Sequence, residues 1–194
     1  METPLRNRIP THLSTSFSPV YGQSISIRPM RPEDLEIETA FVHGLSPQSR
    51  YNRLFSAGMH ITPEWLEQLT RIDYARDMAL VATFMLDDNE VEIGVARYVL
   101  LDDARRCEFA IAIADAWQGS GIGRALMLRL IESAAAAGLE QMVGDVLAGN
   151  EPMLHLARKL GFSVKSTRDG PELRRLTLQL KTENPGAAEG PHRT

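Results

Sequence analysis

The chain has 194 residues, of which 43% are hydrophobic and 24% are charged, a composition typical of one globular domain with a full-sized core. The formal net charge of -4 excludes a general electrostatic attraction to nucleic acid or to anionic membranes. The single cysteine, Cys107, excludes an intramolecular disulfide, and the five histidines show no paired metal-ligand spacing, so we predict no metal site.

The two ends of the chain differ from its middle. Residues 1–22 and 182–194 are polar and rich in Pro, Gly, Ser and Thr without periodicity, so we predict a flexible tail at each end. One domain is expected between them, over residues 23–181. Because the N-terminus lacks the apolar core of a signal peptide, we expect a cytoplasmic protein.

Within that domain, runs with period-2 alternation predict strands, and proline-led runs at helical spacing predict helices. In chain order we predict a strand at 24–27, helices from Pro32, over 46–54 and over 62–72, strands at 78–86, 91–101 and 107–114, a helix over 121–137, a strand at 141–147, a helix over 151–160, and strands at 162–166 and 173–180. This order predicts an α/β fold with a mixed, mostly antiparallel central sheet of about seven strands flanked by helices.

A glycine-rich corner joins the strand at 107–114 to the helix after it. The segment reads Gln118-Gly119-Ser120-Gly121-Ile122-Gly123-Arg124. Glycines at this place allow a tight bend, and the free amides of the first helical turn, with Arg124 nearby, favour binding of a pyrophosphate. A P-loop is excluded because Arg124-Ala125 stands where Lys and Ser or Thr are needed, and the dinucleotide fingerprint lacks its third glycine. The alternative is that the glycines only form a turn.

This Gln-x-x-Gly-x-Gly pattern resembles the acyl-CoA pyrophosphate loop of the GNAT superfamily of N-acetyltransferases, and the resemblance extends over residues 25–180. Asn150, followed by Leu160-Gly161-Phe162, looks like the later GNAT signature, in which the asparagine contacts the CoA arm; it also reads as a helix N-cap. Residues 45–51 and 72–82 are similar to the acetyltransferase domain of bacterial Pat-type protein-lysine acetyltransferases. The resemblance implies the GNAT fold and acetyl-CoA as cosubstrate.

The strand at 107–114 presents two different faces. Alternation places Cys107 and three other bulky side chains on one face, and Glu108 with three alanines on the other. The row of small side chains favours a groove for a thin pantetheine arm that ends near Glu108. A lysine acceptor, with a pKa near 10.4, must lose a proton before it attacks, and a carboxylate in an apolar setting can take that proton. The resemblance to Pat-type enzymes, which share the Glu-Phe-Ala motif, implies that Glu108 is this general base. Alternatively, Glu108 is a solvated glutamate or pairs with Arg97 or Arg105.

A backbone amide of this strand, such as that of Ile111 or Ile113, is expected to stabilise the oxyanion of the reaction. The residues that we assign to acetyl-CoA binding are Ile111, Ala112, Ile113, Gln118, Gly119, Ser120, Gly121, Ile122, Gly123, Arg124 and Asn150.

The sequence departs from the family at one position. Many GNAT enzymes have a tyrosine four residues before the Gly-Phe pair that protonates the departing thiolate, and here that residue is Ala157. The thiolate could leave unprotonated, or His155 or Tyr98 could substitute. Cys107 as a covalent acceptor is disfavoured, because a buried thiol without an activating group is inert.

The sequence predicts an acyltransferase that moves an acetyl group from acetyl-CoA to a primary amine, with a protein lysine as the favoured acceptor. The alternatives are a small-molecule amine acetyltransferase and a non-catalytic acyl-CoA sensor. Residues 41–62 are expected to shape the acceptor site, and the absence of acidic residues there disfavours polyamines. The expected partners are acetyl-CoA and the acceptor, without nucleic acid or membrane, and the expected assembly is a monomer or homodimer.

Overall fold

The computed structural model describes residues 9–54, 61–167 and 170–180. The strands are β1 (Thr15–Val20), β2 (Gln23–Pro29), β3 (Met78–Leu86), β4 (Asn89–Leu100), β5 (Arg106–Ile113), β6 (Gln141–Leu147), β7 (Ser163–Thr167) and β8 (Gly170–Gln179). The helices are α1 (Leu35–Gly44), α2 (Pro47–Leu54), α3 (Pro63–Thr70), α4 (Ile122–Ala136) and α5 (Glu151–Lys159), with short 3-10 turns η2 (Thr11–Leu13), η3 (Pro32–Asp34) and η4 (Asp115–Trp117).

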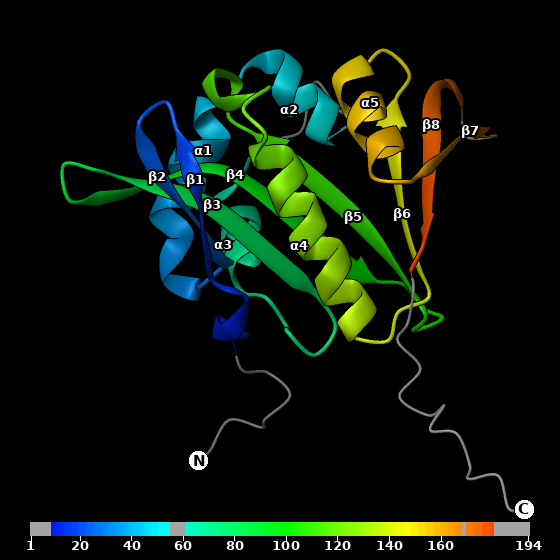
Figure 1. The fold of residues 1–194 in the computed structure, drawn as a ribbon, viewed down its shortest axis with the longest axis horizontal. Helices are drawn as coiled ribbons and strands as arrows, with labels where there is room; N and C mark the ends of the chain where they lie inside the picture. The colour runs from blue at the N-terminus through cyan, green and yellow to red at the C-terminus, as the bar shows by residue number, and fades with distance from the viewer. Residues whose placement is uncertain (1–8, 55–60, 168–169, 181–194) are drawn as a thin grey trace, which may run out of the picture.

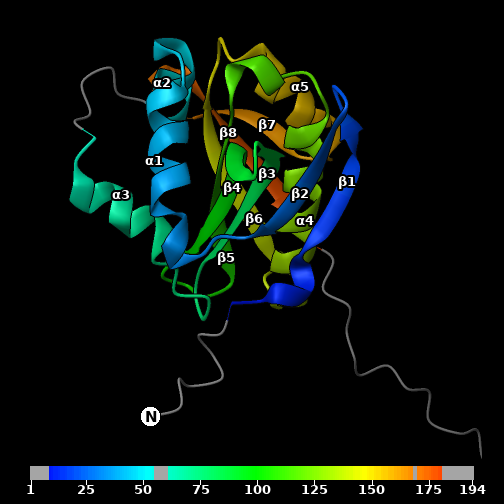
Figure 2. The same cartoon turned by 90° about the vertical axis from the view of Figure 1, so that its left-hand side faces the viewer.

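All eight strands form one sheet in the order β1-β2-β3-β4-β5-β6-β8-β7. Helices α1, α2 and α3 lie against one face of this sheet, called here the front, while α4 and α5 lie against the other (Figures 1 and 2). The larger apolar core lies on the α4 and α5 side and includes Leu80, Phe109 and Leu126. A smaller core around Phe41 and Val95 lies beneath the three front helices. The expected α/β architecture is therefore confirmed.

Part of the segment predicted as an N-terminal tail belongs to the sheet instead. Strand β1 pairs antiparallel with β2, which raises the number of strands from about seven to eight. The hairpin turns at Tyr21 and Gly22, whose φ angles of 52° and 78° suit a two-residue turn. The polar, proline-containing sequence of β1 gave no strand signal, which explains the wrong prediction. The predicted C-terminal tail lies outside the described residues.

The other elements follow local signals in the sequence. β3 and β6 have the predicted bounds, and α3 begins after Thr62, whose side chain accepts a hydrogen bond from the Trp65 amide. Pro63 stands at the first helical position, where its missing N–H costs no hydrogen bond. No helix in the described ranges is long and apolar enough to cross a membrane.

Candidate active site

The sheet opens between β5 and β6, which among the described strands are the only parallel neighbours. The two strands pair at Arg106–Gln141, Cys107–Met142 and Glu108–Val143, and beyond these residues no pairing joins them. Both strands nevertheless continue, β5 to Ile113 and β6 to Leu147. The result is a gap, called here the β5–β6 gap, that begins at Glu108 and widens toward the start of α4.

Backbone groups of β5 face this gap. The Ala114 amide donates to the Ile93 carbonyl on β4, at 2.9 Å. Because the amide and carbonyl of successive strand residues point to opposite sides, those of Ile111 and Ile113 point away from β4 and into the gap. The Ile113 carbonyl accepts a hydrogen bond from Gln118 Nε2 at 3.2 Å on that side. The amides of Ile111 and Ile113 are therefore available to a ligand.

The glycine-rich corner lies at the wide end of the gap. Gly119 and Gly121 have φ angles of 74° and 92°, which favour glycine, and Gly121 is the N-cap of α4. The first intrahelical bond runs from the Ala125 amide to the Gly121 carbonyl, so the preceding amides of this turn have no partner within the helix. Arg124 is exposed and lines, with Gly121, a groove of about 380 Å³ between β1 and α4.

Gln118 has an internal role in this corner. Its side-chain amide donates to Ser49 Oγ as well as to the Ile113 carbonyl. Ser46 and Ser49 of the α2 start in turn donate to the Asp115 carboxylate at 2.7 and 2.8 Å. These bonds fix α2 to the end of β5, a long-range contact that the sequence did not predict.

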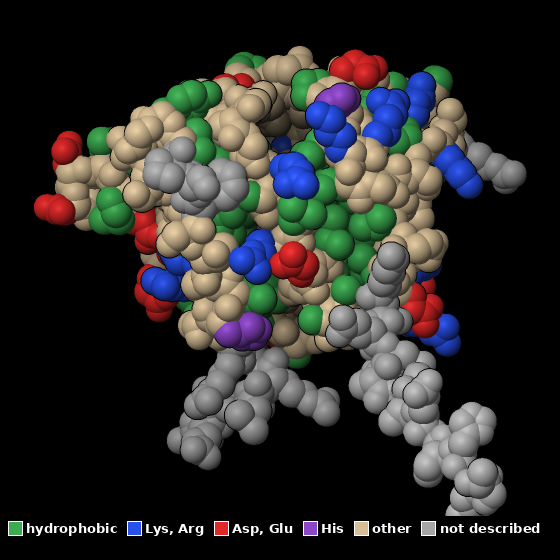
Figure 3. Space-filling view, viewed as in Figure 1, with side chains coloured by type: hydrophobic (Ala, Val, Ile, Leu, Met, Phe, Trp, Pro, Cys, Tyr) green, Lys and Arg blue, Asp and Glu red, His purple; other side chains and the backbone are tan. Residues whose placement is uncertain are grey.

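Asn150 is the N-cap of α5, and its side chain accepts from the Met153 amide at 3.3 Å. The predicted capping role is therefore confirmed. The starts of α4 and α5 flank the same opening, and Figure 3 shows the surface hollowed between them, with Lys and Arg side chains gathered beside the hollow. A long anionic ligand can lie with one end at these helix starts and the other in the gap.

Glu108 lies on the front of the sheet at the residue where β5 and β6 part. Its two candidate partners bind other acids: Arg97 Nη2 lies 3.2 Å from Glu38 Oε1, and Arg105 Nη1 lies 3.3 Å from Glu140 Oε1. Glu108 is exposed rather than enclosed by apolar groups. The expected apolar setting is wrong at this position, because the front helices cover Ala112 and Ala114 but not Glu108.

Comparison with known proteins identifies this arrangement. Residues 49–162 match the acetyltransferase (GNAT) family. Acetyltransferase PA5475 of Pseudomonas aeruginosa is 39% identical over 141 residues, covering 73% of this chain and 76% of that relative. The chain belongs to the GNAT family.

Two further relatives match smaller shares of their own length. Acetyltransferase Pat of Mycolicibacterium smegmatis is 32% identical over 72% of this chain, which spans 41% of that longer protein. The L-amino acid N-acyltransferase MnaT of Escherichia coli is 33% identical over 46% of this chain and 55% of its own length. The names of these relatives agree on acyl transfer, and among them only that of MnaT states an acceptor, an L-amino acid.

Solved structures share the GNAT fold. The GNAT domain of S. lividans PAT superposes with a TM-score of 0.79 at 23% identity, covering 89% of this chain and 100% of that one. The putative acetyltransferase yncA of Salmonella typhimurium, solved with its cofactor acetyl-CoA, gives a TM-score of 0.61 at 24% identity and covers 84% of this chain and 98% of that one. As a GNAT acetyltransferase, this chain uses acetyl-CoA as its acetyl donor.

The front face of this GNAT domain carries a row of side chains that crosses the gap. Arg97 pairs in register with Ala110 on β5. On the β6 side, Asp145 lies two residues beyond Val143, the partner of Glu108, and therefore on the same face. Arg175 pairs in register with Asp145 and donates two hydrogen bonds to its carboxylate, of 2.6 and 2.8 Å. Asp145 could not be identified from the sequence, because only the strand register places it beside the gap.

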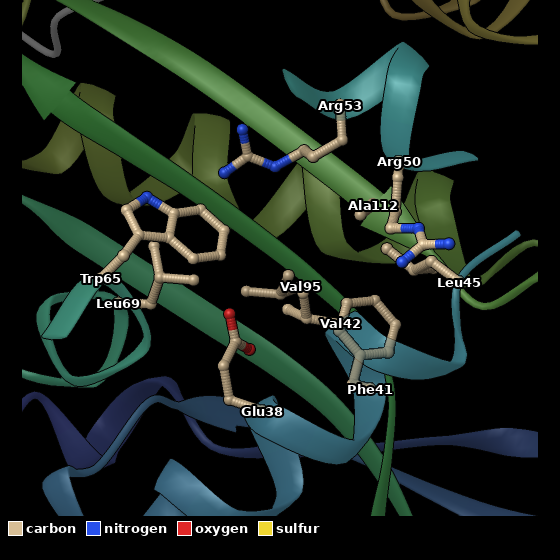
Figure 4. A pocket seen from close by; sticks show the side chains of 10 residues that line it. All are labelled: Glu38, Phe41, Val42, Leu45, Arg50, Arg53, Trp65, Leu69, Val95 and Ala112. Carbon is tan, nitrogen blue, oxygen red and sulfur yellow. The ribbon is translucent and has the colours of Figure 1, made fainter. Parts of the chain in front are cut away.

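A pocket under the front helices lies next to Ala112 (Figure 4). Trp65 and Phe41 line it, Glu38 points into it from α1, and Arg53 extends over it from α2. Burial and the nearby charge of Arg97 lower the pKa of Arg53 to about 10. The enclosed space is about 20 Å³, which holds about one water molecule, so this pocket does not admit an acceptor in the present conformation. Of the segment expected to shape the acceptor site, residues 55–60 lie outside the described ranges.

The three positions considered in connection with a general acid have different surroundings. Ala157 is fully buried in the core, His155 is exposed on α5, and Tyr98 is buried on the α4 side of the sheet. Cys107 is buried, and burial raises the pKa of its thiol to about 12, as expected for a packing residue. The described residues contain no cluster of three potential metal ligands.

Proposed function

We propose that this GNAT enzyme acetylates protein lysine side chains, with Glu108 as the general base. The observation that carries the proposal is the position of Glu108: its carboxylate lies at the narrow end of the β5–β6 gap, while the neighbouring Arg97 and Arg105 bind other acids. The 32% identity with a Pat acetyltransferase supports the same acceptor class.

Acetyl-CoA fits the residues present. The amides of Gly121, Gly123 and Arg124 at the start of α4, which have no partner within the helix, suit its pyrophosphate. The Ile122 amide, 3.5 Å from Ser120 Oγ, belongs to the same turn, and Gly119, Ser120 and Gln118 shape the corner that presents these amides. From there to Glu108, the free edge of β5 offers the backbone groups of Ile111 and Ile113 to the pantetheine arm, while Ala112 between them pairs with Val95 on β4 and adds only its small side chain to the groove. We place Asn150 beside the arm, where its second role is the cap of α5.

The donor supplies an acetyl thioester, and the protein supplies proton transfer and charge stabilisation. Glu108 accepts a proton from the lysine ammonium, directly or through a water, so that the neutral amine attacks. The amide of Ile111 or Ile113 donates to the carbonyl oxygen as negative charge develops on it. As the tetrahedral intermediate collapses, the C–S bond breaks and CoA leaves as the thiolate. The nitrogen loses its second proton to solvent, the thiolate takes one proton from solvent, and Glu108 releases its proton to solvent.

The decisive variant is Glu108→Gln, which keeps the shape of the side chain and removes its basicity. We expect kcat with a lysine peptide to fall by about 10²–10⁴-fold while the affinity for acetyl-CoA is unchanged. Between pH 7 and 10 the turnover rate of the variant should rise about tenfold per pH unit, because the acceptor amine loses its proton to solvent without the base. The matched control is Glu36→Gln, at an exposed glutamate of α1. Unchanged turnover in Glu108→Gln would exclude Glu108 as the base.

A small-molecule acceptor is the second candidate, favoured by the similarity to an L-amino acid N-acyltransferase. Incubation with acetyl-CoA, a lysine-bearing protein and free amino acids, followed by mass spectrometry, compares the two acceptors directly. Preferential acetylation of the α-amine of a free amino acid would replace the lysine proposal.

A further inference from the structure

The β6 side of the gap is a firmly held edge. Every residue of β6, from Gln141 to Leu147, pairs with β8, whereas pairing with β5 ends at Val143. Asp145 is therefore fixed on this edge, on the same face as Glu108. From the spacing of neighbouring strands and the rise per residue, the Asp145 Cα lies on the order of 8 Å from the Glu108 Cα, on the opposite side of the gap near its narrow end.

The partner of Asp145 determines which end of the ion pair meets the gap. Arg175 stands on β8, one strand farther from the gap, and donates both hydrogen bonds to Asp145 from that side. The carboxylate is thus the end of the pair nearer the gap. A carboxylate has about four lone-pair positions, so it can still accept from an ammonium while two are occupied by the guanidinium.

Asp145 is also accessible. The front helices pack over β3, β4 and β5, and the core beneath them includes no described residue of β6, β7 or β8. The Asp145 side chain is 18% exposed, compared with 1% for Glu38 under the helices. An acceptor that approaches Glu108 from the front on the β6 side can therefore contact Asp145.

We propose that Asp145, oriented by Arg175, positions the acceptor and selects a cationic alkylammonium group, such as a lysine side chain, over a free amino acid. The inference deepens the proposed function and rests on it for the place of reaction. Glu108 and Asp145 flank the site with two carboxylates, which attract an ammonium and repel the carboxylate that a free amino acid carries within about 3 Å of its amine.

The cations on the same face do not offset this preference. Arg97 and Arg175 are each paired with an acid. Arg50 and Arg53 of α2 line the pocket under the front helices, together with Glu38. Lys165, opposite Arg175 on β7, lies two strands beyond Asp145, on the order of 10 Å away, and an amino acid held at the gap cannot reach it.

The test measures binding without chemistry. The enzyme is loaded with CoA and titrated calorimetrically at pH 7 with Nα-acetyl-lysine amide or with its neutral isostere, Nα-acetyl-norleucine amide. We expect Asp145→Asn to weaken binding of the lysine compound about 5- to 10-fold and to leave binding of the norleucine compound unchanged. With acetyl-CoA, the same variant should raise KM for a lysine peptide by a similar factor, with kcat within about threefold.

The matched control is Glu140→Gln, which removes the acid of the exposed Arg105–Glu140 ion pair. This pair lies away from the gap, so the variant should bind both compounds with the wild-type affinity. Equal effects of Asp145→Asn on both compounds, or no effect on either, would overturn the inference, as would a wild-type enzyme that binds both compounds equally. The two proposals can fail independently. If only the assignment of Glu108 as the base is wrong, Glu108→Gln retains full turnover while the enzyme still binds the lysine compound in preference to the norleucine compound.

Discussion

At the scale of single residues, the most unusual feature is a pair of buried glutamates on the front of the sheet. Glu38 and Glu92 are 1% and 4% exposed. Burial, and then the charge of Glu38, raises the pKa of Glu92 well above its ordinary value. With both groups ionised, Glu38 Oε2 and both Glu92 oxygens would lack a hydrogen-bond donor within the described residues. A proton on Glu92 that is donated to Glu38 resolves this conflict, and Arg97 then balances the charge of Glu38.

This arrangement predicts a pH-dependent stability. The pKa of Glu92 is higher in the folded state than in the unfolded state. The contribution of protonated Glu92 to the free energy of unfolding is therefore complete below the unfolded-state pKa of about 4.3, and it is lost as the pH rises toward the folded-state pKa. Glu92→Gln keeps a neutral donor, so its stability relative to wild type should improve by about 1.4 kcal/mol per pH unit in that window. Urea denaturation at pH 5, 6, 7 and 8 measures the difference. A constant difference across these pH values would show that Glu92 is already ionised in the folded protein.

At the scale of elements, β6 and β8 are fixed by extensive pairing, while the narrow end of the β5–β6 gap depends on one glycine. An added Cβ at Gly144 would lie 2.6 Å from Phe109 Cε1, closer than real contacts allow. The Phe109 ring also packs against Phe162, with centroids 5.2 Å apart, so it has little freedom to move aside. Gly144 thus lets Phe109 fill the space where the strands begin to part.

Gly144→Ala is expected to destabilise the fold by about 1–3 kcal/mol through overpacking. The double variant Phe109→Leu/Gly144→Ala should recover part of that loss, since the smaller side chain leaves room for the new methyl group. Gly44→Ala is the control, because a Cβ there meets no atom within 4 Å. Chemical denaturation of the three variants measures the effect, and equal stability of Gly144→Ala and wild type would mean that Phe109 repacks without cost.

The sequence predicted most elements because their signals are local. Pro63 after Thr62 marks the start of α3, and Gly138 follows the last turn of α4. The two faces of β5 were also predictable from alternation: Cys107 and Phe109 pack in the larger core, and Ala112 packs beneath the front helices.

The features of the site that could not be predicted from the sequence depend on residues far apart in the chain. The exposure of Glu108 follows from where the front helices end, and the location of Asp145 follows from a register between strands far apart in the chain. The bonds that join Asp115 to Ser46 and Ser49 span more than sixty residues, at separations of 69 and 66. No periodicity within one segment encodes such contacts.

At the scale of the whole molecule, the sheet consists of two parts, β1 to β5 and β6 to β8, that share backbone pairing only at the narrow end of the gap. Helices α4 and α5 cover one part each on the back, with α4 over β3, β4 and β5 and α5 against β7. A donor that lies in the gap and reaches both helix starts would bridge the two parts. Binding should therefore stabilise the fold and protect the edge of β5.

We expect CoA at a concentration 100 times its Kd to stabilise the protein by about 2.7 kcal/mol and to slow hydrogen exchange at the amides of Ile111 and Ile113. Gly121→Glu should abolish both effects, because it places a negative charge at the α4 start and forces a side chain into a φ of 92°. The matched control is Gly138→Glu, at the far end of the same helix, where φ is 78° and no atom lies within 4 Å of an added Cβ. It carries the same backbone strain and charge but should retain CoA binding, so equal loss in both variants would mean that strain, and not the anion site, accounts for the effect.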